Sequence, residues 1–131
     1  MLQSKEGPKD TTECLVDAEY VMIYVSAHWC GPCRAMTPRI ASAYRQQTGN
    51  VRVVFLSLDK SQGQFAEYFQ TMPWYAVQYD EDRHEITNKL SDIIQSPIQS
   101  IPSLIVFDKA GNVVTSEGCR NFDQYFKSID A

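Results

Sequence analysis

The sequence predicts an α/β protein with a mixed central β-sheet of about four to five strands flanked by helices on both faces. Nearly continuous apolar runs at 20–27 and 51–58 are typical of strands that are buried on both faces. Between them, the segment 31–48 repeats its apolar residues at helical spacing and is followed by Gly49-Asn50, a stop signal. These three segments predict a strand–helix–strand unit with parallel strands and a right-handed crossover.

Helices are expected in three further segments. Apolar residues line one face of 62–72 and one face of 84–95, and Pro73 and Pro97 terminate these two helices. A last amphipathic helix is predicted from the spacing of four apolar residues near the C-terminus, Phe122, Tyr125, Phe126 and Ile129.

A hairpin is predicted between the last two of these helices. Its strands, at 103–108 and 112–116, flank Lys109-Ala110-Gly111. Gly111 can adopt the positive φ that such short loops require. The second strand is expected to form an antiparallel edge of the sheet.

Length and composition indicate one globular domain. The chain has 131 residues, of which 44% are apolar, as in proteins with a single core. The segment 1–13 is polar, so we predict that it is flexible and that one domain spans 14–131. A short strand is expected around Cys14–Val16, and we expect the protein to be a monomer.

Charge and hydropathy exclude several classes of function. The net charge is −4 and there is no run of lysine or arginine, which argues against nucleic-acid and anionic-membrane binding. No stretch approaches the roughly 20 apolar residues that span a bilayer. The N-terminus lacks the apolar centre of a secretory signal, so the cytoplasm is the predicted location. Four cysteines are too few for a disulfide-dense secreted scaffold.

The motif Trp29-Cys30-Gly31-Pro32-Cys33 stands where the first buried strand turns into a helix. At a helix N-terminus, unpaired N–H groups and the helix dipole stabilise an anion, and the thiolate is the reactive form of cysteine. Pro32 suits the first turn of the helix because its missing N–H would have no partner there. Cys33 lies one turn further on, near enough to resolve a mixed disulfide. This pattern predicts redox chemistry.

Two other interpretations of the cysteine pair remain open at this point. A zinc site would need two more ligands, but Cys14 and Cys119 stand alone and His28 and His84 have no paired spacing. No metal is therefore expected. A pair of inert buried thiols is the second alternative, which the strand-to-helix position of the motif disfavours.

The segment SAHWCGPCRAMTP, which includes Pro38, resembles the active-site segment of thioredoxins. The segments VVFLSLD, MPWYAV and SIPSLIVFDKAGNVVT look like those of tryparedoxins and nucleoredoxins, and the resemblance covers about residues 20–116. It implies the thioredoxin fold and thiol–disulfide oxidoreductase activity. At three places on the rim that faces the substrate, the sequence differs from the pattern of tryparedoxins. Gly31 replaces a proline that is usual in tryparedoxins, Asp59-Lys60 replaces an acidic pair, and extra residues lie within Gln95–Gln99.

The resemblance also implies that the Ile101-Pro102 bond is cis and lies beside the cysteine pair, with Ile101 offering its backbone to an extended substrate segment. The alternative is a proline that merely opens a strand. Asp59 follows the second buried strand and should fall on the same edge of the sheet as Cys30. We predict that Asp59 assists proton transfer to or from Cys33; the alternative is a solvated strand-end acid.

Three aromatic residues and one histidine complete the candidate site. Tyr24 stands where thioredoxins keep a buried aspartate, six residues before the first cysteine, and it is assigned a supporting role. Trp29 is predicted to shield and position the site, and Trp74 to flank the same edge and contact substrate, with packing in the core as the alternative for both. His28 is expected to be an exposed bystander.

These residues predict an enzyme that reduces protein disulfides through a redox-active Cys30–Cys33 pair, without a bound cofactor. A separate reductant must restore the dithiol. The resemblance implies trypanothione or glutathione if the chain works like tryparedoxins and a reductase if it works like thioredoxins, with a peroxiredoxin among the candidate acceptors. Cys14 and Cys119 are expected to be free thiols. A non-catalytic binding module that uses the cis-proline groove is the alternative function.

Overall fold

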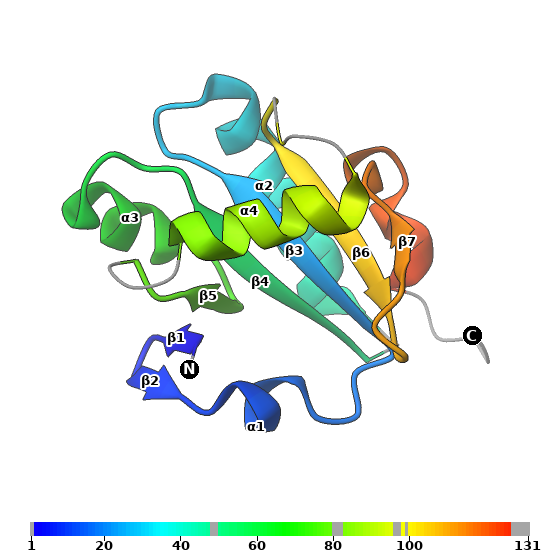
Figure 1. Ribbon diagram of the computed structural model, residues 1–131. Helices are drawn as coiled ribbons and strands as arrows, with labels where there is room; N and C mark the ends of the chain where they lie inside the picture. The colour runs from blue at the N-terminus through cyan, green and yellow to red at the C-terminus, as the bar shows by residue number, and fades with distance from the viewer. Residues whose placement is uncertain (1, 48–49, 80–82, 96–97, 99, 127–131) are drawn as a thin grey trace.

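In the computed structural model, a seven-stranded mixed sheet forms the centre of the molecule (Figure 1). The structure describes residues 2–47, 50–79, 83–95, 98 and 100–126. In chain order the strands are β1 (Leu2–Ser4), β2 (Gly7–Lys9), β3 (Tyr20–Ser26), β4 (Val51–Ser57), β5 (Tyr75–Val77), β6 (Ser103–Asp108) and β7 (Val113–Thr115). The helices are α1 (Thr11–Leu15), α2 (Gly31–Gln46), α3 (Gln62–Phe69) and α4 (Arg83–Ile94), and two 3₁₀ turns follow at Gly118–Arg120 and Phe122–Tyr125.

The strand order is β2-β1-β5-β4-β3-β6-β7. Strands β3, β4 and β5 are parallel, and the pairs β3–β6, β6–β7, β1–β5 and β1–β2 are antiparallel. This confirms the predicted β3–α2–β4 unit and the antiparallel hairpin edge. Gly111 has φ 89°, as expected for the hairpin loop.

Each face of the sheet carries its own hydrophobic core. Alternate residues of β3 point to opposite faces, so Tyr24 packs in the cluster that contains Ile40 of α2, and Val25 packs in the cluster that contains Leu90 of α4. Figure 1 shows α4 crossing one face of the sheet while α2 lies behind it. The prediction of helices on both faces is therefore confirmed.

The sheet has more strands than the predicted four to five, mainly because of the N-terminus. The segment predicted to be flexible, 1–13, instead contains β1 and β2, and Leu2 of β1 pairs with Val77 of β5. These strands have three residues each, too few to produce a recognisable alternation of apolar and polar residues.

The strand expected around Cys14–Val16 is also wrong, because α1 ends there. The Asp10 side chain accepts a hydrogen bond from the N–H of Thr12 at 2.9 Å and caps this helix. The short strand β5 was not predicted. In place of a last helix, the structure has the two 3₁₀ turns, and Ile129 lies outside the described residues.

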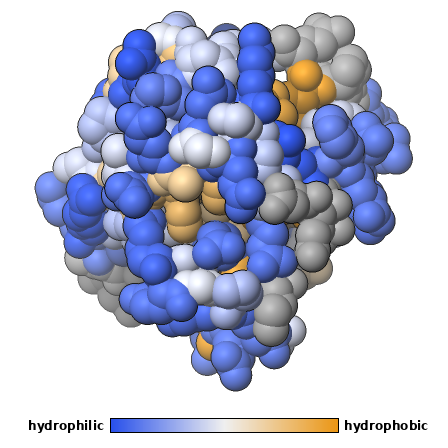
Figure 2. Space-filling view, turned by 90° about the vertical axis from the view of Figure 1, so that its left-hand side faces the viewer, coloured by the Kyte–Doolittle hydropathy of each residue, from blue (hydrophilic) through white to orange (hydrophobic). Residues whose placement is uncertain are grey.

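The N-terminal hairpin packs against α3. Lys5, in the turn between β1 and β2, donates hydrogen bonds to the carbonyl groups of Phe69 and Met72 at 2.8 and 2.6 Å. Its ammonium group lies 3.6 Å from the centre of the Phe69 ring. Figure 2, which views this side of the molecule, shows a small apolar hollow within a largely hydrophilic face. No helix in the described ranges is both long and apolar enough to cross a membrane.

Candidate active site

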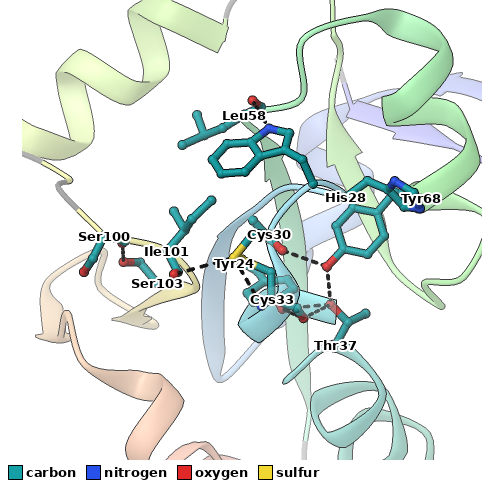
Figure 3. The surroundings of a disulfide bond; sticks show 12 residues. Tyr24, His28, Cys30, Cys33, Thr37, Leu58, Tyr68, Ser100, Ile101 and Ser103 are labelled. Carbon is teal, nitrogen blue, oxygen red and sulfur yellow. Dashed lines mark hydrogen bonds between the residues drawn. A yellow bond between two sulfur atoms is a disulfide. The ribbon is translucent and has the colours of Figure 1, made fainter. Parts of the chain in front are cut away.

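Cys30 and Cys33 form a disulfide at the start of α2 (Figure 3). Cys30 is the N-cap residue, with an extended backbone at φ −95° and ψ 113°. Its Sγ atom accepts a hydrogen bond from the N–H of Cys33 at 3.3 Å. The parallel strands β3 and β4 end on this edge of the sheet, which is where α/β folds place their ligand sites. The sulfur of Cys30 therefore occupies the position that a helix N-terminus offers to an anion.

The two cysteines differ in their access to solvent. Cys33 is 0% exposed, whereas Cys30 retains 8% exposure beside the exposed residues Gly31 and Pro32. Thiol–disulfide exchange requires that the attacking sulfur be accessible. This difference fits Cys30 as the attacking residue and Cys33 as the resolving residue. Among the described residues, no three His, Cys, Asp or Glu side chains gather as a metal site would require.

The Ile101-Pro102 peptide bond is cis, as the family resemblance implied. The carbonyl oxygen of Ile101 lies 3.8 Å from Cys30 Sγ. Figure 3 shows the loop that carries Ile101 on one side of the disulfide, with Ser100 and Ser103 beside it. The structure thus brings together cysteines and a proline that are far apart in the sequence. The role of Ile101 and Pro102 in binding the substrate stays a prediction.

Asp59 lies directly after β4 and is 2% exposed, so it is not a solvated strand-end acid. Its Oδ1 atom accepts a hydrogen bond from the N–H of His28 at 2.7 Å, and its Oδ2 atom accepts one from the Ser57 hydroxyl at 2.7 Å. The carboxylate therefore holds the turn that leads into Cys30. Arg83, which was not predicted as part of the site, donates to the carbonyl oxygens of Ser57 and Asp59 at 3.1 and 3.0 Å.

Tyr24 belongs to a chain of buried hydroxyl groups beneath Cys33. Its hydroxyl lies 3.2 Å from the Cys33 carbonyl oxygen and 2.8 Å from Thr37 Oγ1. Thr37 Oγ1 is 2.9 Å from the same carbonyl and 2.6 Å from the Tyr68 hydroxyl, which in turn is 2.8 Å from Ser26 Oγ. Burial raises the pKa of Tyr24 well above its ordinary value, so this hydroxyl remains protonated at neutral pH.

Thr37, Tyr68 and Ser26 were not predicted as part of the site. Thr37 has a weak signal in the sequence, since it stands four residues after Cys33 and thus one helical turn along the same face. Tyr68 has none, because its position on α3 fitted an ordinary apolar stripe.

Trp29 and His28 flank the cysteine pair. Trp29 is 52% exposed, and its Nε1 donates to the carbonyl of Leu58 at 3.2 Å, so the ring is fixed at the surface beside Cys30. Lys60 Nζ lies 5.8 Å from the centre of the Trp29 ring. His28 was expected to be an exposed bystander but is half-buried, with its ring edge-to-face with Tyr68 at 5.7 Å.

Trp74 does not lie at the surface predicted for it. It is 3% exposed and packs in the core, edge-to-face with Tyr24 at 6.1 Å and with Tyr44 at 5.5 Å. The structure therefore supports the alternative of core packing, and the prediction of substrate contact was wrong. The error arose because the sequence places Trp74 near the active-site edge but does not say which way its ring points.

Cys14 and Cys119 are free thiols. Cys14 is buried in the core on the α4 face. Cys119 is half-buried, and burial raises its pKa from 9.0 to about 11, which leaves it protonated at neutral pH. Cys119 is therefore a poor nucleophile at neutral pH.

The fold, the cis-proline and the cysteine pair at the start of α2 define a thioredoxin-like protein. A family model described as Thioredoxin-like matches residues 17–113, and the chain belongs to this family of oxidoreductases. Among proteins of known name, the chain is similar to nucleoredoxin from Danio rerio, with 39% identity over 122 residues that cover 90% of the chain and 28% of that protein. It is also similar to tryparedoxin from Trypanosoma brucei brucei, with 34% identity over 67% of the chain and 60% of that protein.

Solved structures confirm the relationship. Thioredoxin from Wuchereria bancrofti superposes with a TM-score of 0.81 at 31% identity, covering 92% of this chain and 83% of that one. Native tryparedoxin I from Crithidia fasciculata superposes with a TM-score of 0.79 at 33% identity, covering 94% of this chain and 83% of that one. The chain spans between 19% and 28% of the length of these nucleoredoxins, for example 28% of the human protein.

Proposed function

We propose that this chain reduces disulfides in other proteins, with Cys30 as the attacking thiolate and Cys33 as the resolving thiol. The observation that carries the proposal is the asymmetry of the pair. Cys30 Sγ accepts the N–H of Cys33 at the start of α2 and is partly exposed, while Cys33 is 0% exposed. A sulfur in this setting is stabilised as an anion, and the thiolate is the form that attacks a disulfide.

The reaction proceeds through two exchanges at sulfur. The Cys30 thiolate attacks one sulfur of the substrate disulfide, and the other substrate sulfur leaves as a thiolate and takes up a proton. Cys33 then loses its proton and attacks Cys30 Sγ, which releases the second substrate sulfur. The substrate gains two electrons and two protons in total, and Cys30–Cys33 is left as the disulfide seen in the structure.

We further propose that a low-molecular-weight thiol or a reductase in the cytoplasm restores the dithiol. One relative of similar structure, a tryparedoxin II, is described as complexed with glutathionylspermidine, at 31% identity and a TM-score of 0.68 over 79% of this chain and 72% of that one. This supports trypanothione or glutathione as the first candidates, and a peroxiredoxin as one acceptor to test. A reducing compartment is also where a dithiol of this kind is maintained.

The first test is reduction of insulin disulfides with dithiothreitol as the electron donor. Wild-type protein should accelerate precipitation of the insulin chains, and Cys30→Ser should abolish the acceleration because the attacking sulfur is gone. Cys33→Ser that has been reduced and then freed of dithiothreitol should instead accumulate a mixed disulfide with the substrate, detectable by mass spectrometry. Equal rates for wild type and Cys30→Ser would favour the binding-module alternative.

We propose that Asp59 assists proton removal from Cys33 in addition to holding the turn at His28. Asp59→Asn keeps an oxygen that can accept the His28 N–H but removes the carboxylate. Resolution of the mixed disulfide by Cys33 should slow by about tenfold or more at neutral pH, with a changed pH–rate profile. The exposed Asp92→Asn variant on α4 is the charge-matched control. An unchanged profile in Asp59→Asn would leave this residue with its positioning role alone.

A further inference from the structure

A groove separates α2 from α3 on the side of the disulfide away from the cis-proline loop. Figure 3 shows His28, Tyr68 and Thr37 on this side of Cys33, opposite Ile101. Most of the residues that line the groove come from one stripe of α2, on which Arg34, Pro38 and Arg45 are exposed and Ala41 is buried. The lining includes His28, Arg34, Pro38, Ala41, Arg45 and Tyr68.

The stripe has an apolar middle and a cation at each end. Pro38 and Ala41 form the middle, and Arg34 and Arg45 stand at the two ends. Among the described residues, no Asp or Glu lines the groove. In the described part of the chain, the ion pairs within 4.0 Å are Lys9–Glu6 and Lys89–Glu85, so neither arginine has a carboxylate partner there.

This positive charge stands out on a chain whose net charge is −4. Lys60, whose ammonium group lies over the Trp29 ring, adds a cation at the rim of the active site. Arg34 directly follows Cys33, so the groove begins at the cysteine pair. Neither cysteine lines the groove itself, so a peptide bound in it must extend past Arg34 to bring its disulfide to Cys30.

The spacing of the two arginines sets the size of the occupant. Arg45 stands eleven positions after Arg34 on the helix, a rise of about 16.5 Å. An extended peptide covers that length with about five residues. Two acidic side chains about five residues apart, with small apolar residues between them, would match the groove in both charge and polarity.

Resting on the proposed function, we propose that the groove between α2 and α3 binds an acidic extended segment of the protein substrate, with Arg34 and Arg45 pairing with carboxylates that flank its apolar centre. The groove thereby selects acidic substrates. It acts in addition to the backbone of Ile101, which lies on the other side of the disulfide.

The test compares prereduced protein with disulfide-linked peptides that carry two glutamates five residues apart, or glutamines at the same positions. Product is separated by chromatography after acid quench. Wild type should reduce the glutamate peptide about three- to tenfold faster than the glutamine peptide, as expected for two partly exposed ion pairs. The ratio of the two reduction rates should fall towards one in the R34Q/R45Q variant. It should also fall towards one for wild type at about 0.5 M NaCl, which screens such pairs.

The double variant R39Q/K109Q removes two positive charges outside the groove and should keep the wild-type ratio. The inference would be overturned if wild type reduced the glutamate and glutamine peptides at equal rates. It would also be overturned if R34Q/R45Q and R39Q/K109Q lost the preference for the glutamate peptide to the same extent. A small neutral disulfide, bis(2-hydroxyethyl) disulfide, separates the two proposals. R34Q/R45Q should reduce it at the wild-type rate, whereas failure of wild type to reduce insulin disulfides would overturn the proposed function itself.

Discussion

Thr37 is the residue that joins α2, β3 and α3 beneath the disulfide. Its hydroxyl lies within hydrogen-bond distance of Tyr24, Tyr68 and the Cys33 carbonyl, and the residue is 3% exposed. Polar groups that are buried without a partner destabilise a fold, but here each hydroxyl has at least one. The network therefore fixes the first turns of α2, and with them the position of Cys33.

Thr37→Val should remove one hydroxyl at nearly constant volume and leave Tyr24 and Tyr68 without a shared partner. We expect the free energy of unfolding to fall by about 1–3 kcal/mol, because the hydrogen bonds of Thr37 are lost, while Tyr24 keeps the Cys33 carbonyl and Tyr68 keeps Ser26. Urea denaturation of the oxidised protein measures this. Thr71→Val is the control, because Thr71 is exposed and its hydroxyl binds only the carbonyl of Tyr68. Similar small losses in both variants would show that the network contributes little.

At the residue scale, the sequence identified the reacting cysteines but not the buried hydroxyl groups that hold them in place. Cys30 and Cys33 could be named because their residue types and spacing carry the signal, and Pro102 because the segment around it resembles that of the family. Tyr68 could not, because it meets Thr37 only after α3 has packed on the sheet, 31 residues along the chain. Trp74 was misplaced for the same reason, since the direction of its ring is decided by tertiary packing.

Among the elements, the N-terminal hairpin depends on one lysine for its attachment to α3. Lys5 reaches two carbonyl groups at the end of that helix and covers the Phe69 ring. Burial lowers the pKa of Lys5, so part of the gain from these contacts is offset by desolvation of the ammonium group. Cations near a helix C-terminus are favourable because they bind carbonyl groups that lack helical partners.

Lys5→Met keeps the length of the side chain and removes the charge and the hydrogen bonds. The free energy of unfolding should drop by about 1–2 kcal/mol, allowing for the partial burial of this lysine. Lys9→Met, which disturbs only the exposed pair with Glu6, should change stability by less than about 0.5 kcal/mol. Urea denaturation checks both variants. Equal stability of the two would mean that the hairpin is held by its pairing with β5 instead.

Elements with long apolar runs were predictable, and short ones were not. Strands β3 and β4 have seven residues each, and their burial on both faces is visible in the sequence. Strands β1, β2 and β5 have three residues each. Strand β7 is equally short and was predicted only because the turn at Gly111 precedes it. Such strands form because a neighbouring backbone offers hydrogen bonds, and backbone pairing leaves no pattern in the side chains.

At the scale of the whole molecule, the sheet places every part of the redox site on one edge. Strands β3 and β4 end beneath Cys30 and Asp59, and the loop before β6 brings the Ile101 carbonyl to the disulfide. The two cores on either face hold this edge rigid. The fold thus supplies a partly accessible sulfur at a helix start, and leaves the other thiols buried or protonated.

The most direct test of this account is the pH dependence of alkylation of the reduced protein by iodoacetamide, read at each cysteine by mass spectrometry. Cys30 should react fastest. Its alkylation rate should be half-maximal at a pH of about 7, below the ordinary cysteine pKa of about 8.5. Cys119, whose pKa burial raises to about 11, should remain slow up to that pH. A midpoint for Cys30 at or above 8.5, or faster alkylation of Cys33, would contradict the claim that α2 stabilises an attacking thiolate at residue 30.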